Sequence, residues 1–415
     1  MMNETKSLPI TKGMVLEAYK AVRSNRGSAG VDNISLQDFE EKLDKHLYKI
    51  WNRLSSGSYF PPPVKEVEIA KKDGGVRKLG IPTVGDRIAQ MVIKEYLEER
   101  FEKLFHPNSY GYRPLKSAHD ALKQVRQNCR EYAWVIDMDI KGFFDNIGHG
   151  LLMLAIEKHV EEKWVKMYIK RWLEMPIEKK SGDMVYKEGK GTPQGGVISP
   201  LLANLFLHYV LDVWLSIKFP MVSFVRYADD AIIHCHSKGQ SELVLRELHQ
   251  RMEECNLELH KDKTKIVYCK DYRRKEKFDT VKFDFLGFSF QPRSMKSKRD
   301  DGWFLGFSPA ISKASQNRIV DELRKTNFHK WSNAKIEDIA QLLNPKIRGW
   351  VNYYGKFSRF MLGRLFRRLH HRLIKWLMNR YKRLKSSVNK AYAMLKRIFK
   401  SNPNLFAHWS AGYRI

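Results

Sequence analysis

Cysteine is scarce in this chain of 415 residues. The four cysteines, Cys129, Cys235, Cys255 and Cys269, form no Cys-x-x-Cys pair and follow no regular spacing. A disulfide framework or a structural zinc site would need cysteines at characteristic spacings. The sequence therefore argues against both, and it predicts a protein of the reducing cytoplasm.

Long apolar runs are also missing. Residues 1–6 contain no apolar core of the kind that a secretion signal requires. The most apolar long segment spans residues 198–217, but Asn204, His208 and Asp212 interrupt it. A membrane span needs about 20 predominantly apolar residues. We therefore expect a buried helix here and no membrane span.

Acidic residues are absent from the last fifth of the chain. Residues 339–415 contain 18 Lys and Arg side chains and no Asp or Glu, so this segment carries +18 of the formal net charge of +29. Such a segment predicts a polyanionic partner, because counterion release on binding supplies much of the affinity. An anionic membrane surface is the alternative partner.

The overall composition is that of a folded protein. Hydrophobic residues make up 43% of the chain and aromatic residues 12%, which excludes wholesale disorder. The length allows two or three domains with a substantial core.

Residues 223–234 are the centre of the functional argument. They consist of two short apolar runs on either side of Asp229 and Asp230, a pattern that predicts a β-hairpin with both acids at its tip. Side chains alternate faces along a strand, so two consecutive acids cannot both enter one core. They are either solvated at an ordinary surface turn, where Asp is common, or they hold a cation.

A second carboxylate cluster favours the cation. In residues 134–145 an apolar strand leads to Asp137 and Asp139, which alternation places on one face. Asp139, Asp229 and Asp230, with the backbone carbonyl of Ile140, would form an oxygen-only site suited to Mg²⁺. Two such ions can activate a 3′-hydroxyl and stabilise a leaving pyrophosphate, so we predict polymerase chemistry with these three aspartates as catalytic residues.

These motifs resemble a known family. Tyr227, Ala228, Asp229 and Asp230, together with Asp139, residues 191–196 (Gly-Thr-Pro-Gln-Gly-Gly) and residues 285–287 (Phe-Leu-Gly), are similar to the ordered motifs of reverse transcriptases encoded by bacterial group II introns. The resemblance covers nearly the whole chain. It implies an α+β right-hand polymerase, with fingers, a palm containing an antiparallel sheet, a helical thumb and a short basic helical tail.

The resemblance also implies domain borders. We expect an N-terminal extension at residues 1–60, fingers and palm at 61–300, a three-helix thumb or maturase domain at 301–380 and a nucleic-acid-binding tail at 381–415. In the extension, two helices flank a loop at residues 25–32, which in this family lies over the template.

The same resemblance assigns roles in the fingers. Lys71 and Arg77 flank a Gly turn in a predicted hairpin and would close on the incoming triphosphate, although a solvated basic turn is the alternative. Arg113 would face the template or the nucleotide, with an ordinary structural arginine as the alternative.

Further roles fall on the palm. Phe144 would lie beneath the sugar and exclude a 2′-hydroxyl, while Phe143 points into the core. Gln194, in a Gly-rich loop without the Walker pattern, would contact the nascent base pair through the minor groove. Lys263 would protonate the leaving pyrophosphate, although a surface lysine is the alternative.

The C-terminal part resembles the maturase thumb. Residues 344–354 are similar to the maturase motif, and a helical period places Phe360, Leu362, Leu365, Phe366, Leu369, Leu373 and Trp376 on one apolar face with arginines opposite. The residues that we predict to bind RNA are Arg348, Arg364, Arg367, Arg368 and Arg372. A solvated basic helix face is the alternative.

The resemblance implies a function with several partners. These are a group II intron RNA, an RNA template with a DNA primer, dNTPs and target DNA, and the function is RNA-templated DNA synthesis in intron mobility with assistance to splicing. No cysteine follows Cys269, so we expect no His-Asn-His nuclease of the type with Cys pairs. The alternatives are a reverse transcriptase of phage defence and an RNA-binding maturase without polymerase activity.

Overall fold

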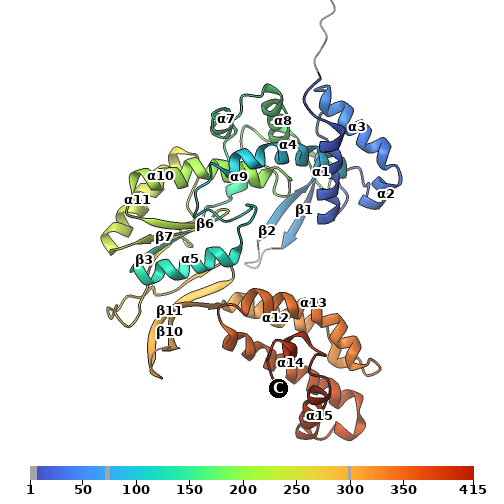
Figure 1. Ribbon diagram of the computed structural model, residues 1–415, viewed down its shortest axis with the longest axis vertical. Coiled ribbons are helices and arrows are strands. Elements are labelled where there is room, and N and C mark those ends of the chain that lie inside the picture. Colours follow the sequence, from blue (N-terminus) through green and yellow to red (C-terminus); the bar gives the residue numbers. More distant parts are fainter. Residues whose placement is uncertain (1–6, 71–74, 298–300) are drawn as a thin grey trace, which may run out of the picture. The chain divides into compact units, whose positions relative to one another are not determined.

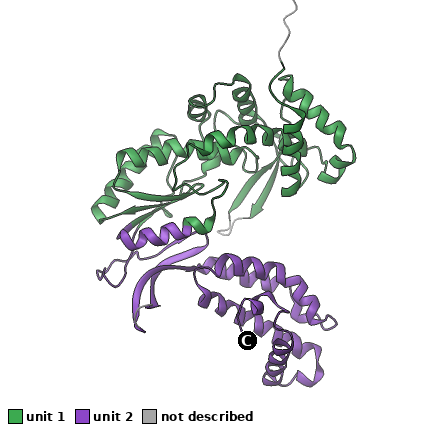
Figure 2. Cartoon of the chain, viewed as in Figure 1, with its two compact units in different colours: residues 1–121, 135–266 green, residues 122–134, 267–415 purple. Residues whose placement is uncertain are grey.

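The computed structural model describes residues 7–70, 75–297 and 301–415. The chain divides into two compact units, which Figure 2 shows in different colours. Unit 1 comprises Met1–Ala121 and Val135–Ile266, and unit 2 comprises Leu122–Trp134 and Val267–Ile415. The secondary structure is mixed α+β, as predicted.

The N-terminal extension is helical. It contains α1 (Lys12–Asn25), α2 (Leu36–Glu41) and α3 (Leu43–Ser55), where the sequence predicted two helices. Thr11 caps α1, and Ser35 forms a capping box with Asp38 at the start of α2. Lys42 separates α2 from α3 because its backbone (φ −128°, ψ 42°) is not helical.

The predicted fingers hairpin is present in unit 1. Strands β1 (Val64–Ala70) and β2 (Val76–Ile81) pair antiparallel, within a sheet ordered β2-β1-β4-β5. The short strands are β4 (Ile177–Glu178) and β5 (Met184–Val185). The helices of this region are α4 (Val84–Glu102), α7 (His149–Glu157) and α8 (Lys163–Glu174), and α5 spans Ala118–Glu131.

The palm is built on a four-stranded sheet ordered β6-β7-β3-β8. Its strands are β6 (Ser223–Tyr227), β7 (Asp230–Cys235), β3 (Trp134–Met138) and β8 (Lys265–Tyr268). The helix α11 (Lys238–Glu254) packs against β7 (Figure 1). The short helix α6 (Phe143–Asn146) follows β3.

A long apolar helical segment supports the palm. It runs through α9 (Ser199–Leu207), a π-helical turn η1 (His208–Asp212) and α10 (Val213–Lys218). Its length and composition alone would allow it to cross a membrane, but 67% of that window is buried inside the structure. Such burial is typical of the core helix of a folded protein, as the sequence predicted.

Unit 2 contains a three-stranded sheet and the thumb helices. The strands β9 (Phe283–Phe285), β10 (Phe288–Lys296) and β11 (Trp303–Ile311) form the sheet β11-β10-β9. The helices α12 (Lys313–Lys325), α13 (Ile336–Tyr354) and α14 (Arg359–Arg380) follow, with a 3₁₀ turn η2 at Phe328–Lys330 (Figure 1). The predicted border at residue 300 therefore falls within the connection between β10 and β11.

The last residues pack onto the thumb helices. A 3₁₀ turn η3 (Lys382–Leu384), α15 (Val388–Ser401) and α16 (Ala407–Ser410) complete unit 2. The Asn344 side chain on α13 donates to the Leu405 carbonyl (3.0 Å) and accepts from the Ala407 N–H (2.8 Å). Phe406 and Trp409 are buried, so the predicted basic tail shares a core with the thumb.

Candidate active site

The two acids lie at the tip of the predicted hairpin. Strands β6 and β7 pair antiparallel up to Tyr227 and Asp230, which leaves Ala228 and Asp229 as the turn. Ala228 adopts φ 56°, in the left-handed region that favours glycine. A two-residue hairpin requires such a backbone conformation, because it matches the twist of the strands.

Three carboxylates come close enough to interact. Burial raises the pKa of Asp229, and the charge of Asp139 raises it further. Asp230 is exposed to solvent at the protein surface. Desolvation by the protein atoms around its carboxylate and the negative charges of Asp229 and Asp139 nevertheless raise its pKa to about 7. The strands β3 and β7 are adjacent in the sheet, which explains the proximity of acids about ninety residues apart in the chain.

The donor set suits a hard cation, although the side chains do not converge on one point. In the part of the chain that the structure describes, no three His, Cys, Asp or Glu side chains lie close enough together to hold one ion. The Lys263 Nζ lies 3.4 Å from an Asp139 oxygen, so a cation of the chain engages this carboxylate. Carboxylates are the ligands that Mg²⁺ prefers, and a divalent cation would offset the repulsion that raises the pKa of Asp230.

A positive charge on the fingers hairpin acts on the carboxylates of this site. Arg77 on β2 is exposed, and its positive charge acts on the Asp229 carboxylate. This position is compatible with the predicted contact to a triphosphate. Lys71, the second residue of that prediction, lies outside the described residues.

The Gly-rich loop lies along the helix that carries Phe144. The Thr192 N–H donates to the Phe144 carbonyl (2.8 Å), and a Cβ at Gly191 would lie 2.9 Å from the Asp145 carbonyl oxygen. The Gln194 carbonyl accepts from the Gly80 N–H (2.8 Å), which holds the loop against β2. Phe144 is half-buried and Phe143 is 2% exposed, so the two rings divide between surface and core as predicted.

The structure corrects the expected orientation of Arg113. Its side chain is 5% exposed, and its guanidinium donates to Glu102 (2.6 and 2.9 Å) and to the carbonyls of His106 and Ser109 (2.7 Å each). These bonds engage the guanidinium within the protein, so it does not face a template or nucleotide. Arg113 is a structural residue, the alternative that the sequence also allowed.

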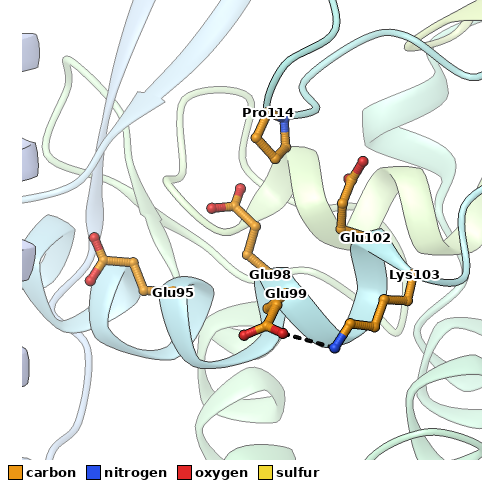
Figure 3. A pocket seen from close by; sticks show the side chains of 6 residues that line it. All are labelled: Glu95, Glu98, Glu99, Glu102, Lys103 and Pro114. Carbon is orange, nitrogen blue, oxygen red and sulfur yellow. Dashed lines mark hydrogen bonds and ion pairs between the residues drawn. The ribbon is translucent and has the colours of Figure 1, made fainter.

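A cavity of about 440 Å³ lies beside Glu102. It is lined by Glu95, Glu98, Glu99, Glu102, Lys103 and Pro114, with Glu99 paired to Lys103 (Figure 3). An acidic lining repels phosphate groups. This cavity therefore does not extend a nucleic-acid site.

The predicted RNA-binding arginines fall into two groups. Arg348, Arg364, Arg367 and Arg368 are exposed on α13 and α14. Arg372 is half-buried, because its guanidinium lies 5.6 Å from the Phe328 ring centre and bonds to His329 (3.1 Å). The other side of α14 is buried as predicted except at Phe360, which is 74% exposed and thus corrects that part of the predicted apolar face.

Sequence reasoning missed Tyr112. This residue has φ 57° and is 54% exposed. Burial and the negative charge of Asp229 raise the pKa of its phenol, which places the ring within electrostatic reach of the hairpin tip. The preceding Gly111 was the only local signal, and it does not identify what the following side chain faces.

A palm sheet with three interacting carboxylates, approached by a basic fingers hairpin, defines a nucleotidyl-transferring polymerase. The reverse transcriptase (RNA-dependent DNA polymerase) family matches residues 69–290, and the group II intron maturase-specific domain matches residues 316–394. The chain therefore belongs to the reverse transcriptases, and within them to the group II intron reverse transcriptase/maturases. Catalysis in this family depends on metal ions.

Two relatives with similar sequences support this assignment. Protein YkfC of Escherichia coli is 31% identical over 294 residues, which cover 61% of this chain and 77% of that protein. The group II intron-encoded protein LtrA of Lactococcus lactis is 33% identical over 271 residues, covering 63% of this chain and 41% of LtrA. A telomerase structure from Candida albicans aligns over 91% of this chain and 67% of its own, with a TM-score of 0.48 and 12% identity.

Proposed function

We propose that this protein is an RNA-directed DNA polymerase that copies its group II intron RNA into DNA during intron mobility. The observation that carries the proposal is the clustering of Asp139, Asp229 and Asp230 in one unit, where the charge of Asp139 helps to raise the pKa values of Asp229 and Asp230. A protein that only binds RNA has no use for three clustered carboxylates beside an anionic ligand.

In this proposal Asp139, Asp229 and Asp230, with the Ile140 carbonyl, would hold two Mg²⁺ ions. When bound, these ions supply activation of the 3′-hydroxyl and charge neutralisation at the leaving pyrophosphate. The protein contributes orientation and proton transfer. Lys263, whose Nζ lies 3.4 Å from an Asp139 oxygen, would give a proton to pyrophosphate.

Three further residues complete the nucleotide site in this proposal. Arg77, with Lys71, contacts the triphosphate as a cation of the fingers. The half-buried ring of Phe144 would lie beneath the sugar and thereby select deoxynucleotides. Gln194 belongs to a loop held against β2, which suits a residue that must contact a base pair at a fixed position.

Features of unit 2 support the proposal of an RNA partner. The maturase-specific domain implies binding of intron RNA. Arg348, Arg364, Arg367 and Arg368 are exposed in a segment without Asp or Glu, so their charge is available to RNA phosphates. Assistance to splicing, binding of target DNA by residues 381–415 and a cytoplasmic location complete the proposal.

The test separates polymerisation from RNA binding. Asp229→Asn should lower Mg²⁺-dependent primer extension by about a hundredfold or more, because the metal-binding charge is lost. RNA affinity should stay within about twofold, since no basic surface changes. Asp44→Asn on α3, an exposed residue, makes the same change of charge and should leave extension intact. Near-normal extension by the Asp229 variant would refute the catalytic assignment.

A further inference from the structure

A buried ion pair lies beneath the aspartate hairpin. Arg226 on β6 donates from Nε and Nη2 to the two carboxylate oxygens of Asp212, at 2.8 and 2.6 Å. Both side chains are 0% exposed. A fully buried ion pair is a poor source of net stability, yet removing one partner costs about 3–5 kcal/mol. The position that this pair gives to the neighbouring backbone therefore explains its presence better than a gain in folding stability does.

The guanidinium also holds the turn that carries Asp229. Its Nη1 donates to the Ala228 carbonyl at 3.0 Å, and Ala228 is the residue with left-handed backbone immediately before Asp229. Left-handed backbone at a residue other than glycine costs about 1 kcal/mol or more. Such a conformation persists only when surrounding contacts determine it. Arg226 provides one of these contacts.

Asn204 links the same guanidinium to a second segment. Its Oδ1 accepts from Arg226 Nη1 (2.9 Å), and its Nδ2 donates to the Gly111 carbonyl (2.7 Å). Gly111 lies so close to the turn that a Cβ would be 2.3 Å from the Ala228 nitrogen. The backbone of this segment also pairs with β6, because Tyr110 N–H donates to the Arg226 carbonyl at 2.8 Å.

The π-helical turn η1 explains how Asn204 and Asp212 reach one guanidinium. In a regular α-helix, a separation of eight residues would place their side chains about 80° apart around the axis. The π-turn, His208–Asp212, is wider and rotates less per residue, so it brings the two side chains toward the same side. Such turns occur frequently at functional sites.

We propose that Arg226, Asp212 and Asn204 are positioning residues that hold the Ala228–Asp229 turn and the Gly111–Tyr112 segment together as one rigid element. This inference rests on the proposed function. It adds that the carboxylates of Asp229 and Asp230 acquire their position from this network. The network acts through the backbone, by its bonds to the carbonyls of Ala228 and Gly111.

The test uses Asn204→Ala, because removing the charged Arg226 or Asp212 would threaten folding. The first readout is hydrogen–deuterium exchange of the full-length protein without substrate. Exchange should rise at least about tenfold at residues 108–112 and 223–235 together, because the variant loses both buried hydrogen bonds of the Asn204 side chain. The second readout is the Mg²⁺ concentration at half-maximal primer extension, which should also rise about tenfold.

A second variant and a control isolate the positioning effect. Arg226→Lys keeps the buried charge but cannot reach Asp212, Asn204 and Ala228 at once, so it should raise exchange in the same two segments. Ile169→Ala removes a fully buried side chain from α8 and destabilises unit 1 without touching the network.

Two results would contradict the positioning role. If Asn204→Ala leaves exchange at residues 223–235 unchanged, or if Ile169→Ala raises exchange and the Mg²⁺ midpoint equally, the network has only a general structural role. Exchange is measured without catalysis, so a failure of the proposed polymerase function would appear separately, as wild-type protein that does not extend a primer.

Discussion

The exposed face of α14 provides the sharpest test of RNA binding. Arg364, Arg367 and Arg368 are exposed there, and the helix is buried on its opposite side. Arg372 is left out of the test, because it packs against Phe328 and its replacement would disturb the thumb core. We therefore consider the triple reversal Arg364→Glu, Arg367→Glu and Arg368→Glu.

The expected magnitude follows from counterion release. Each neutralised phosphate contributes about 0.7 to 0.9 to the slope of log affinity against log salt. If each arginine contacts one phosphate, the triple variant loses about 2 to 3 units of slope. Between about 50 and 200 mM salt, wild-type affinity should then fall roughly 20- to 40-fold more than that of the variant.

The assay is titration of a labelled hairpin RNA at several salt concentrations. A matched control reverses Lys45, Lys49 and Arg53, three exposed cations on α3. This control changes net charge equally but leaves the α14 face intact. Primer extension at saturating short primer-template should persist in the α14 variant, since Asp139, Asp229 and Asp230 are unchanged.

Two results would refute the reasoning. Equal slope changes in both triple variants would show that net charge, and not the α14 face, determines RNA binding. Loss of extension at saturation with an unchanged salt slope would show that this face serves the polymerase reaction instead of RNA affinity.

Three further predictions concern unit 1. Phe144→Ala should admit ribonucleotides and lower the preference for dNTP over NTP, measured by single-nucleotide incorporation. Burial raises the pKa of Asp86 from 3.8 to about 6, so the native state binds more protons than the unfolded state between these values. Unfolding free energy from urea titrations should therefore fall by about 2 kcal/mol as pH rises from about 4 to 6. Gln90→Leu should cost about 2–5 kcal/mol in the same assay, because Gln90 Oε1 accepts from the N–H groups of Val197 (2.7 Å) and Ile198 (3.2 Å).

Each of these predictions has a result that contradicts it. Unchanged sugar discrimination would make Phe144 a core residue. The pH dependence between about 4 and 6 should be missing in Asp86→Asn, and its persistence would assign it to another group. Gln124→Leu removes a single part-buried side-chain bond to Asn128 (2.8 Å) and should cost only about 1 kcal/mol. A similar cost at Gln90 would mean that the two N–H groups find other acceptors.

Features that depend on near neighbours in the chain could be predicted from the sequence. The alternation of residues 223–234 predicted the hairpin with Asp229 and Asp230 at its tip, and the structure confirms it. The helical period predicted most of the buried face of α14. The ordered motifs predicted the family that the comparisons then showed. Strand alternation and helical period are set by backbone geometry within a few residues, so these predictions needed no tertiary information.

The partner of a buried charged side chain could not be predicted in this way, and only the tertiary structure identified it. Arg113 bonds to Glu102 at the end of α4, and nothing in the local sequence distinguishes this pair from an arginine that faces a template. Asn204 and Asp212 looked like mere interruptions of an apolar helix. They meet Arg226 because a π-turn rotates them and because the strand β6 packs beside them. Desolvation makes a buried charge depend on every segment that folds around it, and those segments come from distant parts of the chain.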